Sequence, residues 1–353
     1  MKITYYHSPN EITRSKSDPR LYLVTETVDI AQLCQEVEQP FYGAIVPHII
    51  ANNQLYHEGI LEIRFDERDH VNFYLLDMKR PPEVSLRANT TLMMFSDLFN
   101  SSFEPFLEQF GTLLTTQTLF GSGVGGKSLT PMPSIFDQEQ SYQCHSLIVE
   151  IEAPIHVGVK HGWKPLYGPL VVTKSKDNII YELNNEPAFE VYAKVLRDLD
   201  GQEITSENFF DVAKAYPFGI LSYTQNEFIV RDPLQPTDEQ ALLMVSSIAT
   251  NETVYIMKGD HAGLIEAAVD NARLTLTPHP NHIHLLFDCI SRVLYMGDDF
   301  IQEIEAIAAE TSGMQPIFGI TSIGEITNEG FNSIKVFNKT NLLGSIDNAP
   351  VDD

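Results

Sequence analysis

One glycine-rich run has residue types and spacing typical of phosphate binding: Gly121-Ser122-Gly123-Val124-Gly125-Gly126-Lys127-Ser128 fits the pattern G-x-x-x-x-G-K-S. In such a loop, Lys127 and Ser128 would open a helix whose N–H groups face the phosphates. Pro131 and Pro133 follow closely, and a proline inside a helix removes a hydrogen bond and clashes with the preceding turn. We therefore expect no helix after Ser128. The run is then either a flexible loop or a cradle of backbone N–H groups for a ligand.

The densest group of histidines is His279-Pro280-Asn281-His282-Ile283-His284. Side chains alternate between the two faces of a strand, so His282 and His284 would share one face. The opposite face would be apolar and would carry Ile283, Leu285, Phe287 and Cys289. Two imidazoles on one face could coordinate a metal ion, but the sequence identifies no third ligand. We therefore predict the solvated start of a strand and no metal site, and a metal or haem role for these histidines is the alternative.

Cys289 lies just before Arg292, and a guanidinium lowers the pKa of a thiol where the two side chains meet. A cysteine on an apolar strand face is more often a small core residue, and this is the interpretation we favour. The chain contains no G-x-S-x-G, HExxH or dinucleotide-binding pattern, so we expect no enzyme. Two hydrolases stay open as alternatives: a P-loop nucleotidase that uses Lys127 and Ser128, and a thiol hydrolase that uses Cys289.

The composition restricts the classes of partner. The 353 residues include 23 Lys and Arg against 48 Asp and Glu, which gives a formal net charge of −25. A charge this negative argues against binding to nucleic acids or anionic membranes. Cys34, Cys144 and Cys289 show neither C-x-x-C spacing nor a disulfide framework, and no apolar stretch reaches the ~20 residues of a membrane span. We predict a soluble cytoplasmic protein.

The elements that must position these residues are mostly strands. Short apolar runs within residues 41–76 predict an antiparallel meander. Apolar steps of three and four residues predict one or two helices over 91–114, with Ser101 or Ser102 as a cap. Another helix should begin at Pro187 and end at Gly201, since proline favours a first helical turn and glycine a helix end.

The later part of the chain continues this mixture of strands and helices. Strands are predicted over 144–183, 218–258, 283–289 and 315–321, and helices over 262–276 and 300–311. The pattern predicts an α+β fold of two adjoining lobes, each with antiparallel or mixed sheets and flanking helices. The predicted divisions are a flexible N-terminal segment over 1–20, a first domain over 21–205, a second domain over 206–345 and an acidic tail over 346–353.

Several short motifs follow one another between residues 161 and 340. They are His161-Gly162-Trp163-Lys164-Pro165, Glu186-Pro187-Ala188, Pro217-Phe218-Gly219, Val230-Arg231-Asp232-Pro233, Phe287-x-Cys289-x-x-Arg292, Phe318-Gly319-Ile320-Thr321-Ser322-Ile323-Gly324-Glu325 and Asn338-Lys339-Thr340. In this order they resemble the N-terminal and C-terminal modules of the FIST (F-box and intracellular signal transduction) family. Residues 21–120 resemble the family less clearly. Lys339 departs from the family pattern, in which we expect glutamine.

The resemblance implies a free-standing sensory protein that binds a small ligand, such as an amino acid or related metabolite. The positions that match family motifs, together with the glycine run, give the candidate ligand-binding residues: Gly123, Gly125, Gly126, Trp163, Cys289, Arg292, Gly324 and Glu325. An amino acid needs a cation for its carboxylate, an anion for its ammonium group and an apolar wall. Arg292, Glu325 and Trp163 are of these types.

The resemblance also implies a separate signalling partner, which would be a histidine kinase or a cyclic-dinucleotide signalling protein. One branch of the family binds haem, senses nitric oxide and regulates a histidine kinase, and this is the alternative function. Haem iron needs an axial ligand. The candidates are His145, His161, His282 and His284.

Overall fold

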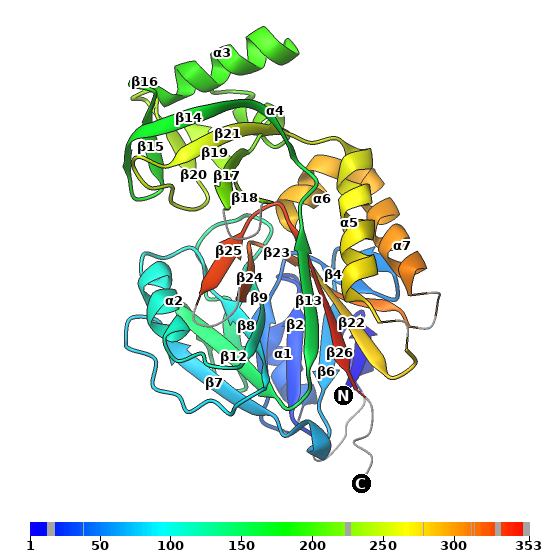
Figure 1. Ribbon diagram of the computed structural model, residues 1–353. Coiled ribbons are helices and arrows are strands. Elements are labelled where there is room, and N and C mark those ends of the chain that lie inside the picture. Colours follow the sequence, from blue (N-terminus) through cyan, green and yellow to red (C-terminus); the bar gives the residue numbers. More distant parts are fainter. Residues whose placement is uncertain are drawn as a thin grey trace.

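The structure is a computed structural model that describes residues 1–12, 18–37, 39–222, 227–277, 279–311, 313, 315–328 and 333–348. It has the α+β architecture that the sequence predicts, with a main body of three sheets and a fourth sheet above it (Figure 1). No helix in these ranges is both long enough and apolar enough to cross a membrane.

The main body consists of three six-stranded sheets, which we call sheets A, B and C. Sheet A has the order β1 (Lys2–Tyr6), β6 (Ile60–Arg64), β2 (Arg20–Val24), β3 (Tyr42–Ile45), β10 (Ile135–Asp137) and β11 (Ser141–Tyr142). Sheet B has the order β13 (Ile155–Lys160), β26 (Asn341–Asp347), β22 (His282–Cys289), β23 (Ile317–Ser322), β4 (Ile49–Ala51) and β5 (Gln54–Tyr56). Sheet C has the order β25 (Ile334–Phe337), β24 (Glu325–Asn328), β9 (Thr118–Gly123), β8 (Thr91–Ser96), β12 (His145–Ile151) and β7 (Asn72–Asp77).

Each of these sheets contains one parallel pair of strands that is joined through helices, as parallel pairs require. The connection from β2 to β3 contains α1 (Ile30–Glu36), and the connection from β8 to β9 contains α2 (Phe103–Gly111). The connection from β22 to β23 contains α6 (Ile290–Met296) and α7 (Phe300–Glu310). The inner faces of the three sheets share one core, to which Leu21, Phe95, Phe120 and Phe287 belong. Helices pack on the outer faces, with α5 (His261–Thr275) beside α7 on sheet B.

Residues 164–258 form a separate unit, which we call the inserted unit. Its eight-stranded sheet contains β18 (Glu227–Arg231), β17 (Phe218–Ser222), β21 (Thr253–Lys258), β14 (Lys164–Lys176), β15 (Ile179–Leu183), β20 (Leu242–Met244), β19 (Pro233–Pro236) and β16 (Glu186–Pro187). The helices α3 (Ala188–Asp200) and α4 (Phe209–Ala213) help to form its own core. Residues 161–163 and 259–260 join the unit to the main body. The predicted division at 205–206 lies inside this unit, between α3 and α4.

Most predicted strands exist, but two predictions about them are wrong. Residues 41–76 form no meander, because β3 and β6 belong to sheet A, β4 and β5 to sheet B, and β7 to sheet C. Only the β4–β5 hairpin is local. Thr91–Ser96 is the strand β8 and not a helix, since a strand buried on both faces shows no alternation that would distinguish it from a buried helix.

Helix boundaries agree better with the sequence. Gly201 ends α3 in the left-handed conformation, as predicted, and Pro187 precedes its first residue. Ser102 occupies the N-cap position of α2, but its side chain makes no capping hydrogen bond. The predicted helices over 262–276 and 300–311 correspond to α5 and α7.

The first and last described residues, Met1 and Asn348, lie close together on the main body. Residues 2–6 fall in the predicted flexible segment, yet they form the edge strand β1. The Met1 ammonium group donates a 2.8 Å hydrogen bond to Asn348, and it lies 3.1 Å from Asp69. The folded part therefore begins earlier than predicted, and the rest of the predicted acidic tail, after Asn348, lies outside the described residues.

Candidate functional site

Buried polar side chains gather where the inserted unit meets the main body. We call them the junction cluster: Trp163, Asp232, Asp288, Cys289, Arg292, Glu303, Glu325, Lys339, Thr340 and Asn341, each less than a tenth exposed. Segments far apart in sequence bring them together. Trp163 lies in one of the two joining segments, Asp232 lies between β18 and β19, and the end of β22 and the start of α6 carry Asp288 and Arg292.

Arg292 is completely engaged by the protein. Its Nε and Nη2 donate to the two carboxylate oxygens of Glu303 at 3.3 and 2.5 Å. Its other donors reach the carbonyl oxygens of His161 at 2.6 Å, Lys339 at 3.2 Å and Leu264 at 3.3 Å. A guanidinium has five N–H donors, so no donor of Arg292 is left for a ligand carboxylate in this structure.

The carboxyl groups around Arg292 form a compact acidic pair. Asp288 Oδ1 lies 3.1 Å from Arg292 Nε, and Asp288 Oδ2 accepts a 2.8 Å hydrogen bond from Asn341. Asn341 also donates to Glu303 at 3.3 Å. Burial, together with the nearby Glu303 carboxylate, raises the pKa of Asp288 well above its usual range. One arginine therefore faces two carboxyl groups, and Asp288 binds a proton more readily than an ordinary aspartate does.

Trp163 is the apolar centre of the junction cluster. The Arg292 guanidinium lies 5.5 Å and the Lys339 ammonium 5.2 Å from its ring centroid, both within the range of cation–π attraction. Lys339 is fully buried, donates to the Lys214 carbonyl oxygen at 2.8 Å and lies 3.1 Å from Asp232 Oδ1. The indole Nε1 of Trp163 is buried and has no hydrogen-bond partner in the described part of the chain.

Glu325 is a buried carboxyl group with one satisfied oxygen. Its Oε2 accepts hydrogen bonds from the Thr340 backbone N–H at 3.2 Å and the Thr340 hydroxyl at 2.5 Å. Its Oε1 is buried and is without a hydrogen-bond partner among the described residues. Burial raises the pKa of Glu325 to about 8, against the opposing effects of Thr340, of the nearby Ser322 hydroxyl and of Arg292. Around neutral pH this carboxyl group is therefore largely protonated.

Cys289 is a core residue, as we favoured from the sequence. It is 1% exposed at the N-cap of α6. Burial, followed by the charges of Glu325 and Asp232, raises the pKa of its thiol well above the usual range. A thiol hydrolase needs a thiolate, and the surroundings of Cys289 oppose one.

The glycine run does not have the geometry of a P-loop. Gly123 ends the strand β9, and its N–H donates to Gly324 at 2.7 Å. The N–H of Gly125 donates to Ile45 at 2.8 Å. No helix follows Ser128, as predicted, and Lys127 Nζ donates to the His57 carbonyl oxygen at 2.9 Å. These N–H groups are engaged in the sheets and form no phosphate cradle.

The candidate ligand-binding glycines separate into two places. Gly123 and Gly324 are neighbours, and Ser122 pairs with Glu325 across β9 and β24. A Cβ added to Gly126 would lie beside Glu26 and Met132 instead. The structure therefore brings Gly123, Gly324, Glu325, Cys289, Trp163 and Arg292 into one region, and Gly125 and Gly126 lead away from it.

The four histidine candidates for haem ligation do not converge. His145 Nδ1 bonds to Gln143, and His161 Nδ1 accepts from the Trp163 N–H. His282 and His284 share one face of β22, as predicted, and the Nδ1 atoms of both lie near Ser345 Oγ, at 3.1 and 3.2 Å. Within the described ranges no group of three His, Cys, Asp or Glu residues could hold a metal ion.

His284 does not fit the role of a haem ligand. The Nε2 of His284 has no partner in the part of the chain described, but this side chain is 0% exposed and lies beneath packed neighbours. A haem plane needs an open slot beside the imidazole. We therefore derive no step through haem.

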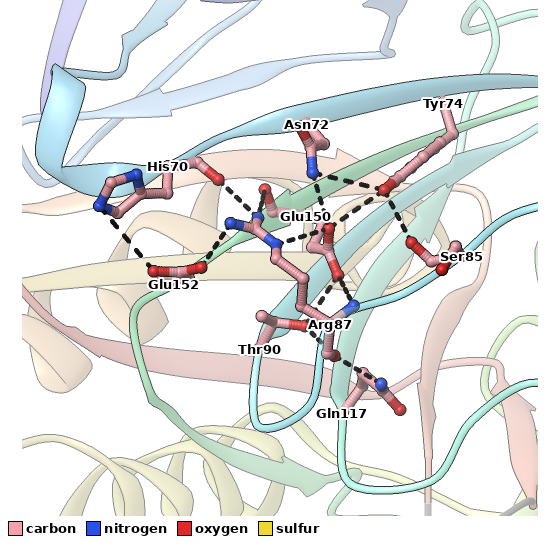
Figure 2. Close-up of polar contacts among 9 residues, drawn as sticks. All are labelled: His70, Asn72, Tyr74, Ser85, Arg87, Thr90, Gln117, Glu150 and Glu152. Carbon is pink, nitrogen blue, oxygen red and sulfur yellow. Dashed lines mark hydrogen bonds and ion pairs between the residues drawn. The ribbon is translucent and has the colours of Figure 1, made fainter.

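A second polar network lies on sheet C (Figure 2). It differs from the junction cluster because both oxygens of its central carboxylate, Glu150, accept hydrogen bonds. Glu150 is 0% exposed and accepts five hydrogen bonds, from the Arg87 N–H and Nε, Thr90, Asn72 and Tyr74. Burial alone would raise the pKa of Glu150, but the hydrogen bonds from Asn72 and Arg87 hold it below its usual value. This network attaches the segment before β8 to the sheet and offers nothing to a ligand.

The sequence analysis missed several members of the junction cluster. Asp232 and Lys339 lie in motifs that the resemblance uses, so their positions were visible. Glu303 had a weaker signal, as an acid on the same face of α7 as the buried Phe300 and Ile307. Such a residue needs a buried partner, but the sequence does not identify that partner as Arg292.

Comparison with family models assigns both halves of the chain. A FIST N domain model matches residues 21–186, and a FIST C domain model matches residues 188–328. No curated protein matches the chain. The first match contains Trp163, and the second contains Asp232, Arg292 and Glu325. Residues of both modules therefore form the junction cluster.

Proposed function

The chain belongs to the FIST family of signal-transduction sensory domains, and we propose that it binds a small ligand at the junction cluster and relays the signal to a separate protein. A ligand between the inserted unit and the main body would stabilise one arrangement of the two. Differential binding of this kind shifts a conformational equilibrium.

One observation carries the proposal. Trp163 Nε1, Asp232 Oδ1 and Glu325 Oε1 are buried in one cluster without hydrogen bonds to the described residues. Asp232 Oδ1 does face Lys339 Nζ at 3.1 Å, whereas the other two atoms have no such contact. Buried polar groups normally have partners, because leaving one unsatisfied costs about 1–3 kcal/mol. A ligand that supplies the missing partners would recover that free energy.

The unpartnered atoms favour an amino acid or a related metabolite. Glu325 Oε1 can accept a hydrogen bond from a donor such as an ammonium group, and Trp163 Nε1 can donate a hydrogen bond to a ligand oxygen. The indole ring is an apolar wall for a ligand side chain. An ammonium group beside Glu325 favours its ionised form, so binding near neutral pH should release a proton.

The partner that we propose is a histidine kinase or a cyclic-dinucleotide signalling protein, on the basis of family membership. The net charge of −25 favours a basic patch on that partner. Association should then weaken as salt increases.

The test uses Trp163, which is the only tryptophan in the sequence, as the reporter. Each proteinogenic amino acid is titrated into the purified protein, and the emission of Trp163 is followed. We expect at least one to change the emission saturably, and Glu325→Gln to weaken that ligand. Glu186→Gln, which alters an exposed residue of β16, is the matched control. If no amino acid binds, or if Glu325→Gln binds as well as the wild type, the assigned ligand class and site are wrong.

A further inference from the structure

Arg231 is a cation at the same junction that has no carboxylate partner among the described residues. It ends β18, and its Nη1 donates only to backbone carbonyl oxygens, those of Val230 at 3.1 Å and Val336 at 3.0 Å. Its Nε is buried without a hydrogen bond to the described residues, its Nη2 makes no ion pair or hydrogen bond with them, and the side chain as a whole is partly exposed. The Nε–Nη2 edge of the guanidinium is thus open.

The fully buried cations of this region, in contrast, are neutralised. Arg292 faces Asp288 and Glu303, and Lys339 faces Asp232 at 3.1 Å. The negative charge of Glu104 raises the pKa of Arg231, but the two side chains form no ion pair. Glu104 instead accepts a 2.9 Å hydrogen bond from Ser247. In a chain with about twice as many acids as bases, a half-buried arginine with no ion pair to the described residues is an exception.

Partial desolvation also favours an anion beside this arginine, whose side chain is half-buried. It lowers the pKa of Arg231 to about 10, since desolvation disfavours the charged form and Glu104 opposes that effect only in part. An anion at the open edge would stabilise the charged form of Arg231 and raise its pKa again. A guanidinium edge matches the two oxygens of a carboxylate in a bidentate pair.

We propose that Arg231 is the residue that binds the carboxylate of the ligand and selects for ligands that carry one. This inference rests on the proposed function, and it gives Arg231 the role that the sequence analysis expected of Arg292. The next residue, Asp232, reaches Lys339 in the junction cluster. Arg231 reaches Val336, which pairs with Ile326 next to Glu325. Arg231 and Glu325 therefore lie at the same pair of strands, β24 and β25.

The test compares matched ligands in the full-length protein. Each amino acid that binds the wild type is paired with the amine that lacks its carboxyl group, such as phenylalanine with phenethylamine. Wild type, Arg231→Gln and Arg231→Lys are titrated by Trp163 fluorescence. We expect Arg231→Gln to bind the amino acid about 10- to 100-fold more weakly, the range of one charge-assisted hydrogen bond, and the amine unchanged. Arg231→Lys should keep part of the preference because it keeps the charge.

Controls separate this inference from its premise and from a folding defect. Urea unfolding of each variant shows whether it folds, and Arg68→Gln removes an exposed arginine that pairs with Asp66. If the wild type binds amino acids and Arg231→Gln retains the wild-type preference, this inference fails and the proposed function stands. If the wild type binds no amino acid, both fail. An equal loss for amino acid and amine would indicate a structural role only and would also overturn the inference.

Discussion

Replacing Glu325 by glutamine should make the protein more stable at high pH. The change keeps the shape of the side chain and an acceptor for Thr340, but it removes the ionisable group. The pKa of Glu325 is raised from 4.5 to about 8, chiefly by burial. In the unfolded chain the residue loses its proton near pH 4.5, whereas in the folded protein it keeps the proton until about pH 8.

The sign of the effect follows from proton binding. Between these two pH values the folded state binds more protons than the unfolded state, so the free energy of unfolding falls as pH rises. At about 1.4 kcal/mol per pH unit, the wild type loses at most about 5 kcal/mol across this window. The variant carries no such penalty. The two proteins should therefore be similar near pH 4.5, and the variant should be more stable by several kcal/mol above pH 8.

Urea unfolding followed by the emission of Trp163 measures this difference at several pH values. Glu186→Gln, at an exposed position, is the control for a change of one formal charge. A difference between wild type and Glu325→Gln that is the same near pH 5 and near pH 9 would refute the reasoning. It would show that Glu325 ionises alike in the folded and unfolded states.

Four further outcomes are expected. Arg292→Met leaves two buried carboxyl groups without their cation and should destabilise the protein by about 3–5 kcal/mol in urea unfolding; a loss below about 1 kcal/mol would contradict the network. Gly319→Ala places a Cβ 1.8 Å from a backbone oxygen of the neighbouring strand and should prevent accumulation of folded protein, whereas Gly201→Ala meets no atom within 4 Å and should cost only about 1–2 kcal/mol, the penalty of the left-handed conformation. Cys289 should resist alkylation in the native protein and react after unfolding, and labelling at the rate of a free thiol would contradict its burial. Equilibrium dialysis should detect no ATP binding to the wild type. ATP binding that is lost in the Lys127→Ala variant would restore the P-loop interpretation.

Local sequence patterns predicted much of the secondary structure. Helix α3 could be predicted because proline and glycine restrict the backbone within a few residues of where they stand. The alternation of side chains along β22 predicted its apolar face, and Leu285 and Phe287 of that face lie in the shared core. The family could also be identified, since its motifs are short and ordered along the chain.

Strand partners could not be predicted from the same patterns. The short apolar runs that form β3 and β7 indicate that each is a strand, but they do not indicate which strand lies beside it. These strands enter different sheets, and β2 and β3 pair in parallel across α1. The pairing depends on how three sheets bury one common core, which is a property of the whole chain.

The candidate site divides in the same way. The sequence by itself placed Trp163, Glu325 and two arginines in family motifs, and it therefore supplied the residue types that a small ligand needs. Only the tertiary structure decided that Arg292 is neutralised by Glu303 and that Arg231 keeps an open edge. The reason is that the charge available to a ligand depends on distances of a few ångströms between residues that are far apart in the chain.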